Sequence, residues 1–249
     1  NESENALILG LLNGIIKGLI IPRTPIYMSV KDDDRHLGHA LRTNQTTPVD
    51  LSTMGETIAG YIATELHQRA ENVAKVVGPK NACHHFASIW SQLSGFMVQT
   101  LMEQGIYELR KVKMPHLDGG RLRLAKASDE ALLRRFLRGF FVDTGAPKNQ
   151  IEDRVNHILT RDLPNGNIVL WEDKLNRTVS VAARVRETEN GASISYVYTP
   201  DEHRRKGHGG RVVACLSQRI LDDGKRMCNL YTDLANPTSN RVYQKLGYQ

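Results

Sequence analysis

The segment of residues 196–210 constrains the fold most, because a strand-like stretch there runs into a glycine-rich turn. Pro200 ends the strand pattern, and apolar residues at helical spacing follow the turn. Glycines tolerate positive φ angles and let backbone N–H groups approach an anion closely. A helix that begins here also directs the positive end of its dipole at the same point. The segment therefore predicts a strand–turn–helix unit with a phosphate site at its turn.

The basic residues of the turn and the spacing of its glycines limit which class of phosphate site it can form. Arg204, Arg205 and Lys206 add positive charge beside the glycines of the turn. The turn lacks the Gly-Lys-Ser/Thr ending of a Walker A loop and the G-x-G-x-x-G spacing of a dinucleotide fingerprint. Neither of these two nucleotide sites is supported.

The second half of the chain predicts a mixed α/β unit. Asn-Gly turns, capping residues and apolar periodicity set the limits of its elements. The expected elements are a strand at 121–126, helices at 128–141 and 147–160, strands at 168–171, 179–185 and 193–199, a helix at 212–221, a strand at 227–232 and a final helix at 236–247. Three antiparallel strands in the middle distinguish this order from a doubly wound dinucleotide fold.

A second motif follows the last expected strand, in residues 236–248. Asn236 is a typical helix N-cap, Pro237 suits the first helical turn, and Gly247 suits the end of a helix. The segment has an asparagine, then a tyrosine seven residues later, then a lysine and a glycine followed by Tyr248.

The two motifs together resemble the signatures of the GCN5-related N-acetyltransferases. The first signature, R/Q-x-x-G-x-G/A, matches the pattern that begins at Arg204, and the second, N-x-x-(A/S)-x-x-x-Y-x-K-x-G-(F/Y), matches the pattern that begins at Asn236. The resemblance covers about residues 121–249 and implies that family's mixed α/β fold for this half of the chain.

The resemblance also implies acetyl-CoA as the cosubstrate and gives its binding residues. In that family two adjacent strands splay apart, the pantetheine arm pairs with the backbone of the first strand, and the pyrophosphate rests on the glycine-rich turn. The implied cosubstrate-binding residues are Val197, Tyr198, Thr199, Arg204, Arg205, Lys206, Gly207, His208, Gly209, Gly210, Asn236, Ser239 and Asn240.

Tyr243 occupies the family's tyrosine position and is the expected general acid for the leaving thiolate. The oxyanion donor would be a backbone N–H around Tyr198. The general base stays open among Glu187, Glu189, Asp233 and a path relayed by water.

The first half predicts a separate domain of alternating strands and helices without either signature, and its apolar spacing predicts helices at 57–75 and 81–101. Residues 114–120 contain Pro115 and a Gly-Gly pair, so they predict a linker between domains at 1–115 and 120–249. A strand at 106–112 would close the first domain. Its layout resembles the N-terminal part of two-domain bacterial acetyltransferases, so we expect a degenerate acetyltransferase-like α/β domain that helps to shape the acceptor site.

The composition limits the other classes of function. The 249 residues are 40% apolar, which suffices for two modest cores, and 33 basic against 27 acidic residues give a net charge of +6. Only 6% of the chain is aromatic and its charges are dispersed, so no nucleic-acid partner is expected.

The cysteines and histidines give no metal or disulfide pattern. Cys83, Cys215 and Cys228 contain no C-x-x-C pair, and adjacent His84 and His85 would point in different directions on a helix. We therefore expect reduced thiols and no metal.

The most apolar N-terminal stretch, residues 6–21, is interrupted by Asn13 and Lys17 and is shorter than the roughly 20 residues of a membrane span. We expect no membrane partner and a cytoplasmic protein. Two functions remain open: an N-acetyltransferase that acts on a primary amine, and a module that binds or senses acyl-CoA without turnover. The acceptor and the preferred acyl chain are not readable, and a homodimer stays open.

Overall fold

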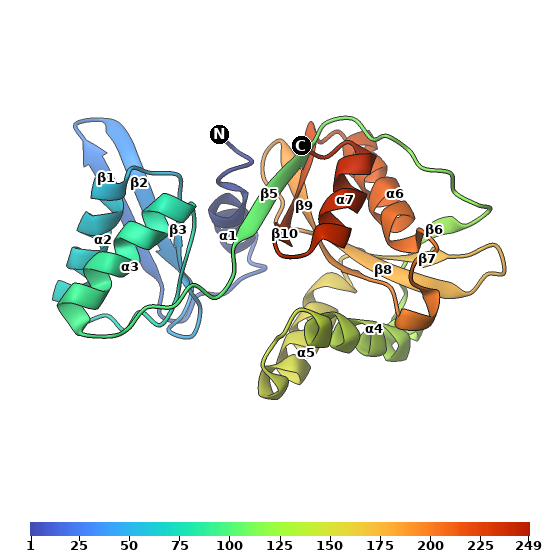
Figure 1. Cartoon of the computed structure of the whole chain (residues 1–249), viewed down its shortest axis with the longest axis horizontal. Helices are drawn as coiled ribbons and strands as arrows, with labels where there is room; N and C mark the ends of the chain where they lie inside the picture. Colours follow the sequence, from blue (N-terminus) through green and yellow to red (C-terminus); the bar gives the residue numbers. More distant parts are fainter. The chain divides into compact units, whose positions relative to one another are not determined.

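The strand β5 (Gln104–Leu109) decides where the chain divides into two units. In the computed structural model, which describes all of residues 1–249, β5 pairs antiparallel with β10 (Met227–Asp233). The units are therefore Asn1–Glu103 and Gln104–Gln249 (Figure 1). The predicted boundary at residues 115–120 lies inside the second unit, because a strand expected to close the first domain completes the sheet of the second.

The N-terminal unit contains a four-stranded sheet in the order β1-β2-β3-β4, in which only β3 and β4 are parallel. Its elements are α1 (Ala6–Ile16), β1 (Ile26–Asp32), β2 (Arg35–Arg42), β3 (Val49–Leu51), α2 (Glu56–Gln68), β4 (Val76–Val77) and α3 (Lys80–Ser94). Val49 of β3, Ile62 of α2 and Phe86 of α3 belong to one buried cluster, so both helices pack on the sheet.

Both long helices of this unit end earlier than the apolar periodicity predicts. The helix expected to continue to residue 101 ends at Ser94, because Gly95 is in the left-handed conformation at φ 75°. The helix expected to continue to residue 75 ends at Gln68, and Ala70 has a φ of 53°. Apolar spacing alone does not locate these turns.

The C-terminal unit contains a six-stranded sheet in the order β5-β10-β9-β8-β7-β6. Its further elements are β6 (Arg121–Leu124), α4 (Glu130–Asp143), α5 (Ile151–Asp162), β7 (Ile168–Glu172), β8 (Thr178–Val185), β9 (Gly191–Tyr198), α6 (His208–Asp222) and α7 (Pro237–Leu246). Only the pair β9–β10 is parallel. The predicted mixed α/β class and the order of elements in this unit are confirmed.

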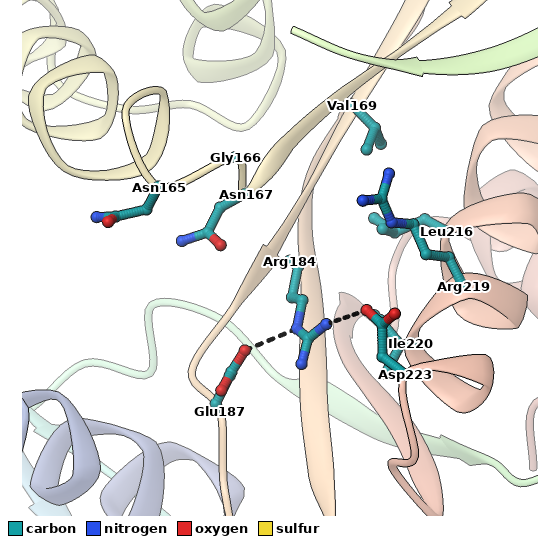
Figure 2. Close-up of a pocket in the computed structure, with 10 residues that line it drawn as sticks. All are labelled: Asn165, Gly166, Asn167, Val169, Arg184, Glu187, Leu216, Arg219, Ile220 and Asp223. Carbon is teal, nitrogen blue, oxygen red and sulfur yellow. Dashed lines mark hydrogen bonds and ion pairs between the residues drawn. The ribbon is translucent and has the colours of Figure 1, made fainter.

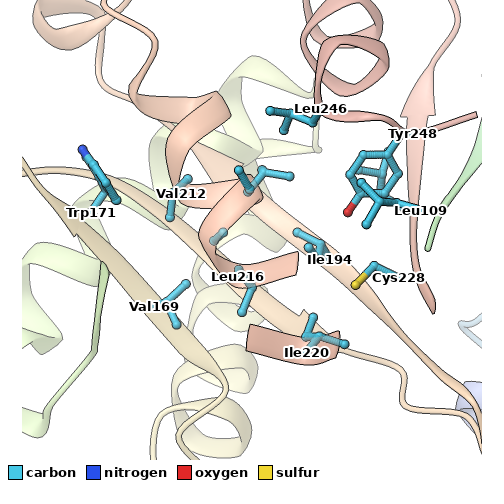
Figure 3. Close-up of a cluster of buried hydrophobic side chains, with 14 of the residues drawn as sticks. Leu109, Val169, Trp171, Ile194, Val212, Leu216, Ile220, Cys228, Leu246 and Tyr248 are labelled. Atoms are coloured by element: carbon cyan, nitrogen blue, oxygen red, sulfur yellow. The ribbon is translucent and has the colours of Figure 1, made fainter. Parts of the chain in front are cut away.

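Helices cover both faces of this sheet through two separate cores. One core lies under α6 and α7, and Figure 3 shows that it includes Val212 and Leu216 of α6 together with Ile194 of β9 and Cys228 of β10. The other core joins α4 and α5 to the opposite face and includes Phe136. In β7 the residues alternate between the two cores, with Val169 and Trp171 in the first and Ile168 and Leu170 in the second. No helix in either unit is long and apolar enough to cross a bilayer.

Gly247 ends α7 where the chain turns back against the segment that follows β5. Its φ is 101°, and a Cβ at this position would lie 3.0 Å from the carbonyl oxygen of Lys111. The next residue, Tyr248, is buried, and its hydroxyl lies 2.8 Å from the hydroxyl of Ser217 on α6. The glycine of the second motif is therefore required by both backbone conformation and close packing.

We expect Gly247→Ala to destabilise the C-terminal unit more than Gly224→Ala does. Both glycines have positive φ, where alanine costs about 1–2 kcal/mol of backbone strain. Only Gly247 adds the contact with Lys111, since a Cβ at Gly224 would meet nothing within 4 Å. Urea unfolding of the two variants measures the difference, and equal losses would contradict the steric role of the Lys111 carbonyl.

Candidate active site

The two parallel strands β9 and β10 part before either of them ends. Their pairing runs from Gly191 with Met227 to Ile194 with Leu230, whereas β9 continues to Tyr198. The edge of residues 195–198 that faces β10 consequently has no strand partner. The expected splayed pair of strands is present at this point.

A bulge in β9 accompanies the parting of the strands. Val181 pairs with Tyr198 and Ala183 pairs with Ser195, so two residues of β9 lie opposite one residue of β8. Tyr196, inside the bulge, has a φ of 54°. The bulge shifts the alternation of side chains, which places Tyr196 and Tyr198 against α4 while Val197 packs with the α6 core.

The glycine-rich turn directs unpaired backbone N–H groups at the end of β9. Gly207 is the N-cap of α6 at φ 80°, and the first intrahelical bond is donated by the N–H of Arg211 to its carbonyl. The N–H groups of residues 208–210 therefore have no acceptor within the helix. A Cβ on Gly209 would lie 3.4 Å from Oγ1 of Thr199, so the turn and the end of β9 adjoin.

Arg211 holds this turn in place, although no sequence motif marks it. Its guanidinium donates to the carbonyl oxygens of Lys206 at 2.7 Å and His116 at 2.8 Å. It also lies 3.8 Å from a carboxylate oxygen of Asp118. Burial, followed by the charge of Arg211, lowers the pKa of His208, so this imidazole is neutral at pH 7.

Arg204 is engaged within the protein and does not present a free charge to the turn. Its guanidinium forms ion pairs with Asp143 of α4 and, at 2.7 Å, with Asp201. It also donates to the carbonyl oxygen of Thr199 at 2.8 Å and lies 5.6 Å from the ring centroid of Tyr198. The side chain of this motif residue therefore ties the turn to α4 and β9.

The other two basic residues of the turn differ from each other. Lys206 donates to the carbonyl oxygen of Glu202 at 2.9 Å. Arg205 is exposed at φ 61° and forms no ion pair, so its charge is available to an anionic ligand.

The second motif begins α7 as the sequence predicts. The side-chain oxygen of Asn236 accepts a hydrogen bond from the backbone N–H of Ser239 at 3.1 Å, which confirms the N-cap. The side chain of Asn240 donates to the carbonyl oxygen of Asp233 at 3.1 Å, while its own oxygen is buried without a partner. The capping groups thus fix the start of α7 at the end of β10.

The two motifs meet between α6 and α7. A Cβ on Gly210 would lie 3.4 Å from Cγ1 of Val242, so the first turn of α6 adjoins the middle of α7. Tyr243 is the next residue, and its ring contacts that of Tyr248 edge to face at 6.0 Å. Its hydroxyl forms no hydrogen bond within the protein, and burial raises its pKa to about 12. Tyr243 therefore carries its proton at neutral pH.

The carboxylates considered as a general base lie in different surroundings. Glu187 forms an ion pair with Arg184 at 2.8 Å, and Glu189 is exposed. Asp233 ends β10 beyond its last pair with β9, and its carboxylate accepts from the N–H of Ala235 at 2.8 Å. None of these contacts selects one carboxylate as the base.

A polar cavity of about 240 Å³ lies at the opposite end of α6. It is lined by Leu216 and Arg219 of α6, and Figure 2 shows the side chain of Arg184 between two carboxylates. These belong to Glu187 at 2.8 Å and Asp223 at 2.7 Å, so the arginine is already neutralised. The cavity shares no residue with the two motifs.

Comparisons with known proteins agree with this geometry. Residues 174–249 match the family model described as FR47-like protein. A GCN5-related N-acetyltransferase from Kribbella flavida has a TM-score of 0.59 and 14% identity, over 97% of this chain and 91% of that protein. A GCN5-related N-acetyltransferase from Sphaerobacter thermophilus has a TM-score of 0.56 and 14% identity, over 88% and 75% of the two chains.

A Drosophila protein is similar with a TM-score of 0.64 and 11% identity, over 98% of this chain and 84% of that one. No curated protein sequence matches the chain. At these identities the solved structures show a shared fold that extends over both units.

The raised pKa of Tyr243 predicts a late ionisation. Its phenol should contribute less than about a tenth of its full tyrosinate absorbance between pH 9 and pH 11, because half-ionisation is expected only at about pH 12. The ultraviolet titrations of the native protein and of Tyr243→Phe should therefore nearly coincide over this range. A difference that develops near pH 10, the value for a tyrosine in water, would mean that the phenol is solvated.

Proposed function

We propose that this chain transfers an acetyl group from acetyl-CoA to a primary amine, because its C-terminal unit matches the FR47-like family model and shares its fold with solved GCN5-related N-acetyltransferases. The observation that carries the proposal is the junction of two unpaired backbone segments. The open edge of β9 at residues 195–198 leads directly to the N–H groups that begin α6. A long ligand with an amide-containing arm and a pyrophosphate matches this succession.

The pantetheine arm and the pyrophosphate of the cosubstrate would bind successive groups of the predicted residues along the chain. The amides of the pantetheine arm would bond the backbone of Val197, Tyr198 and Thr199, along the open edge and at its end. The pyrophosphate would accept from the N–H groups of residues 208–210, with the helix dipole and Arg205 supplying positive charge. The thioester would then lie where β9 and β10 part.

The reaction requires a neutral amine at the thioester. The amine nitrogen attacks the carbonyl carbon, the carbon–sulfur bond breaks, the nitrogen loses one proton and the sulfur of CoA gains one. A backbone N–H at the open edge of β9, around Tyr198, would donate to the carbonyl oxygen as negative charge develops on it.

Tyr243 would donate its phenolic hydrogen to the leaving sulfur. Its hydroxyl has no partner within the protein, and the residue before it, Val242, lies against Gly210 in the first turn of α6. An ordinary thiol has a pKa of about 8.5, below that of this phenol, so complete proton transfer from Tyr243 to the thiolate is uphill. The expected contribution is a hydrogen bond that stabilises the thiolate until a proton reaches it.

The N-terminal unit repeats part of this arrangement, which supports its proposed origin as a degenerate acetyltransferase-like domain. The order β1-β2-β3-α2-β4-α3 matches β7-β8-β9-α6-β10-α7, and β3 and β4 are parallel as β9 and β10 are. The first turn of α2 carries Glu56 where α6 carries glycines. A carboxylate there disfavours a phosphate, so we assign no second cosubstrate site to this unit.

The first test is release of free thiol from acetyl-CoA in the presence of amino acids, polyamines, aminoglycosides and peptides. Tyr243→Phe should lower kcat by about a hundredfold, within the range of acid–base contributions, and leave the Kd for CoA nearly unchanged. Calorimetric titration with CoA measures the Kd. Binding of acetyl-CoA without thiol release from any amine would instead support a non-catalytic sensor.

Arg211→Lys should weaken binding of donors that contain the pyrophosphate, because a lysine cannot span the carbonyls of Lys206 and His116. We expect KM for acetyl-CoA to rise by about tenfold, as the loss of one to two hydrogen bonds implies. KM for S-acetylpantetheine, which lacks the pyrophosphate, should not change. Equal effects on both donors would show that Arg211 only stabilises the fold.

A further inference from the structure

Arg186 differs from the other arginines of the C-terminal unit that are not fully exposed. Each of the others forms an ion pair with a carboxylate; they are Arg123, Arg134, Arg161, Arg184, Arg204 and Arg211. Arg186 is half-buried, forms no ion pair, and has a buried Nε without an acceptor. A partly desolvated guanidinium that lacks an anion costs free energy, which suggests that an anion outside the chain completes the site.

The surroundings of Arg186 place it next to the point where β9 and β10 part. It follows β8 directly at φ 45°, and its guanidinium carbon lies 5.3 Å from the ring centroid of Tyr231. Tyr231 is the first residue of β10 after the last pair, Leu230 with Ile194. The ring of Tyr231 attracts the cation through its π electrons but does not replace a carboxylate as hydrogen-bond acceptor for the guanidinium N–H groups.

Arg186 also lies on the face of the sheet from which an acceptor would approach. Cys228 and Leu230 of β10 belong to the core under α6. Because side chains alternate between the two faces of a sheet, the next residue, Tyr231, faces the other side. The proposed pyrophosphate turn and Tyr243 lie on the α6 and α7 side. Because the donor occupies that side, the amine would reach the thioester from the face that carries Tyr196 and Tyr231.

We propose that Arg186 binds a carboxylate of the acceptor, so that amino acids are the acceptor class of this enzyme. The inference rests on the proposed acetyl transfer. One guanidinium carries one positive charge and offers two parallel N–H groups, which match the charge and shape of a carboxylate. A phosphate monoester carries nearly two negative charges, so a single arginine would leave part of its charge unmatched.

The test compares amino acids with their amides, which keep the amine and lose the carboxylate. The native protein should release thiol with amino acids at a kcat/KM about tenfold to a hundredfold above that with the amides, as a charge-assisted hydrogen bond implies. Arg186→Gln should abolish this preference mainly by raising KM for the amino acid, while KM for acetyl-CoA stays the same. Arg186→Lys should restore part of the preference.

Arg219→Gln is the matched control, because Arg219 is an exposed arginine without an ion pair that lines the separate cavity at the far end of α6. It should retain the full preference for amino acids. Equal kcat/KM for amino acids and amides in the native protein, or an unchanged preference in Arg186→Gln, would overturn the proposal while leaving acetyl transfer intact.

A binding measurement tests the same inference without turnover. With CoA present, calorimetry should detect N-acetyl amino acids but not N-acetyl amino acid amides, and Arg186→Gln should bind neither. Equal binding of both compounds, or of neither, by the native protein would overturn the carboxylate site. If no amine releases thiol but this binding difference is retained, the proposed acetyl transfer is contradicted and the carboxylate site is not.

Discussion

The loss of pairing between β9 and β10 after Ile194 and Leu230 is the constraint on which the candidate site depends. If the two strands stayed paired to their ends, residues 195–198 would have no free edge and no ligand could enter the sheet. The bulge at Tyr196 supplies the local bend. Beyond the open edge, the chain passes through Pro200 into the turn that begins α6, so one strand end leads to both parts of the proposed cosubstrate site.

The strand β5 holds β10 by its other edge where β10 has separated from β9. It pairs with β10 from Cys228 to Asp233, and thus along the part of β10 that has separated from β9. The far end of the chain then returns to β5, where Gln249 and Glu108 exchange two backbone hydrogen bonds of 2.9 Å. The segment that leaves the N-terminal unit is therefore part of the framework that keeps the site open.

Local features of the sequence predicted the elements of the C-terminal unit, whereas distant pairings could not be predicted. The glycines, the Asn236 cap and Gly247 act within a few residues, so their roles were readable. The partner of β5 lies more than one hundred residues along the chain, and strand periodicity does not identify a partner. Arg204 matches a motif, yet the sequence does not show that it pairs with Asp143 of α4. The roles of Arg211 and Arg186 likewise depend on groups that are distant in the sequence, the carbonyl of His116 and the ring of Tyr231.

The most direct measurement of the central claim is the change in backbone amide signals of glycine-labelled protein when CoA is added. The account predicts that Gly209 and Gly210 shift strongly with CoA and much less with pantetheine, because their N–H groups would face the pyrophosphate. Gly166, which lines the cavity beside Arg184, should not shift. Shifts at Gly166 with none in the turn at α6 would contradict the account.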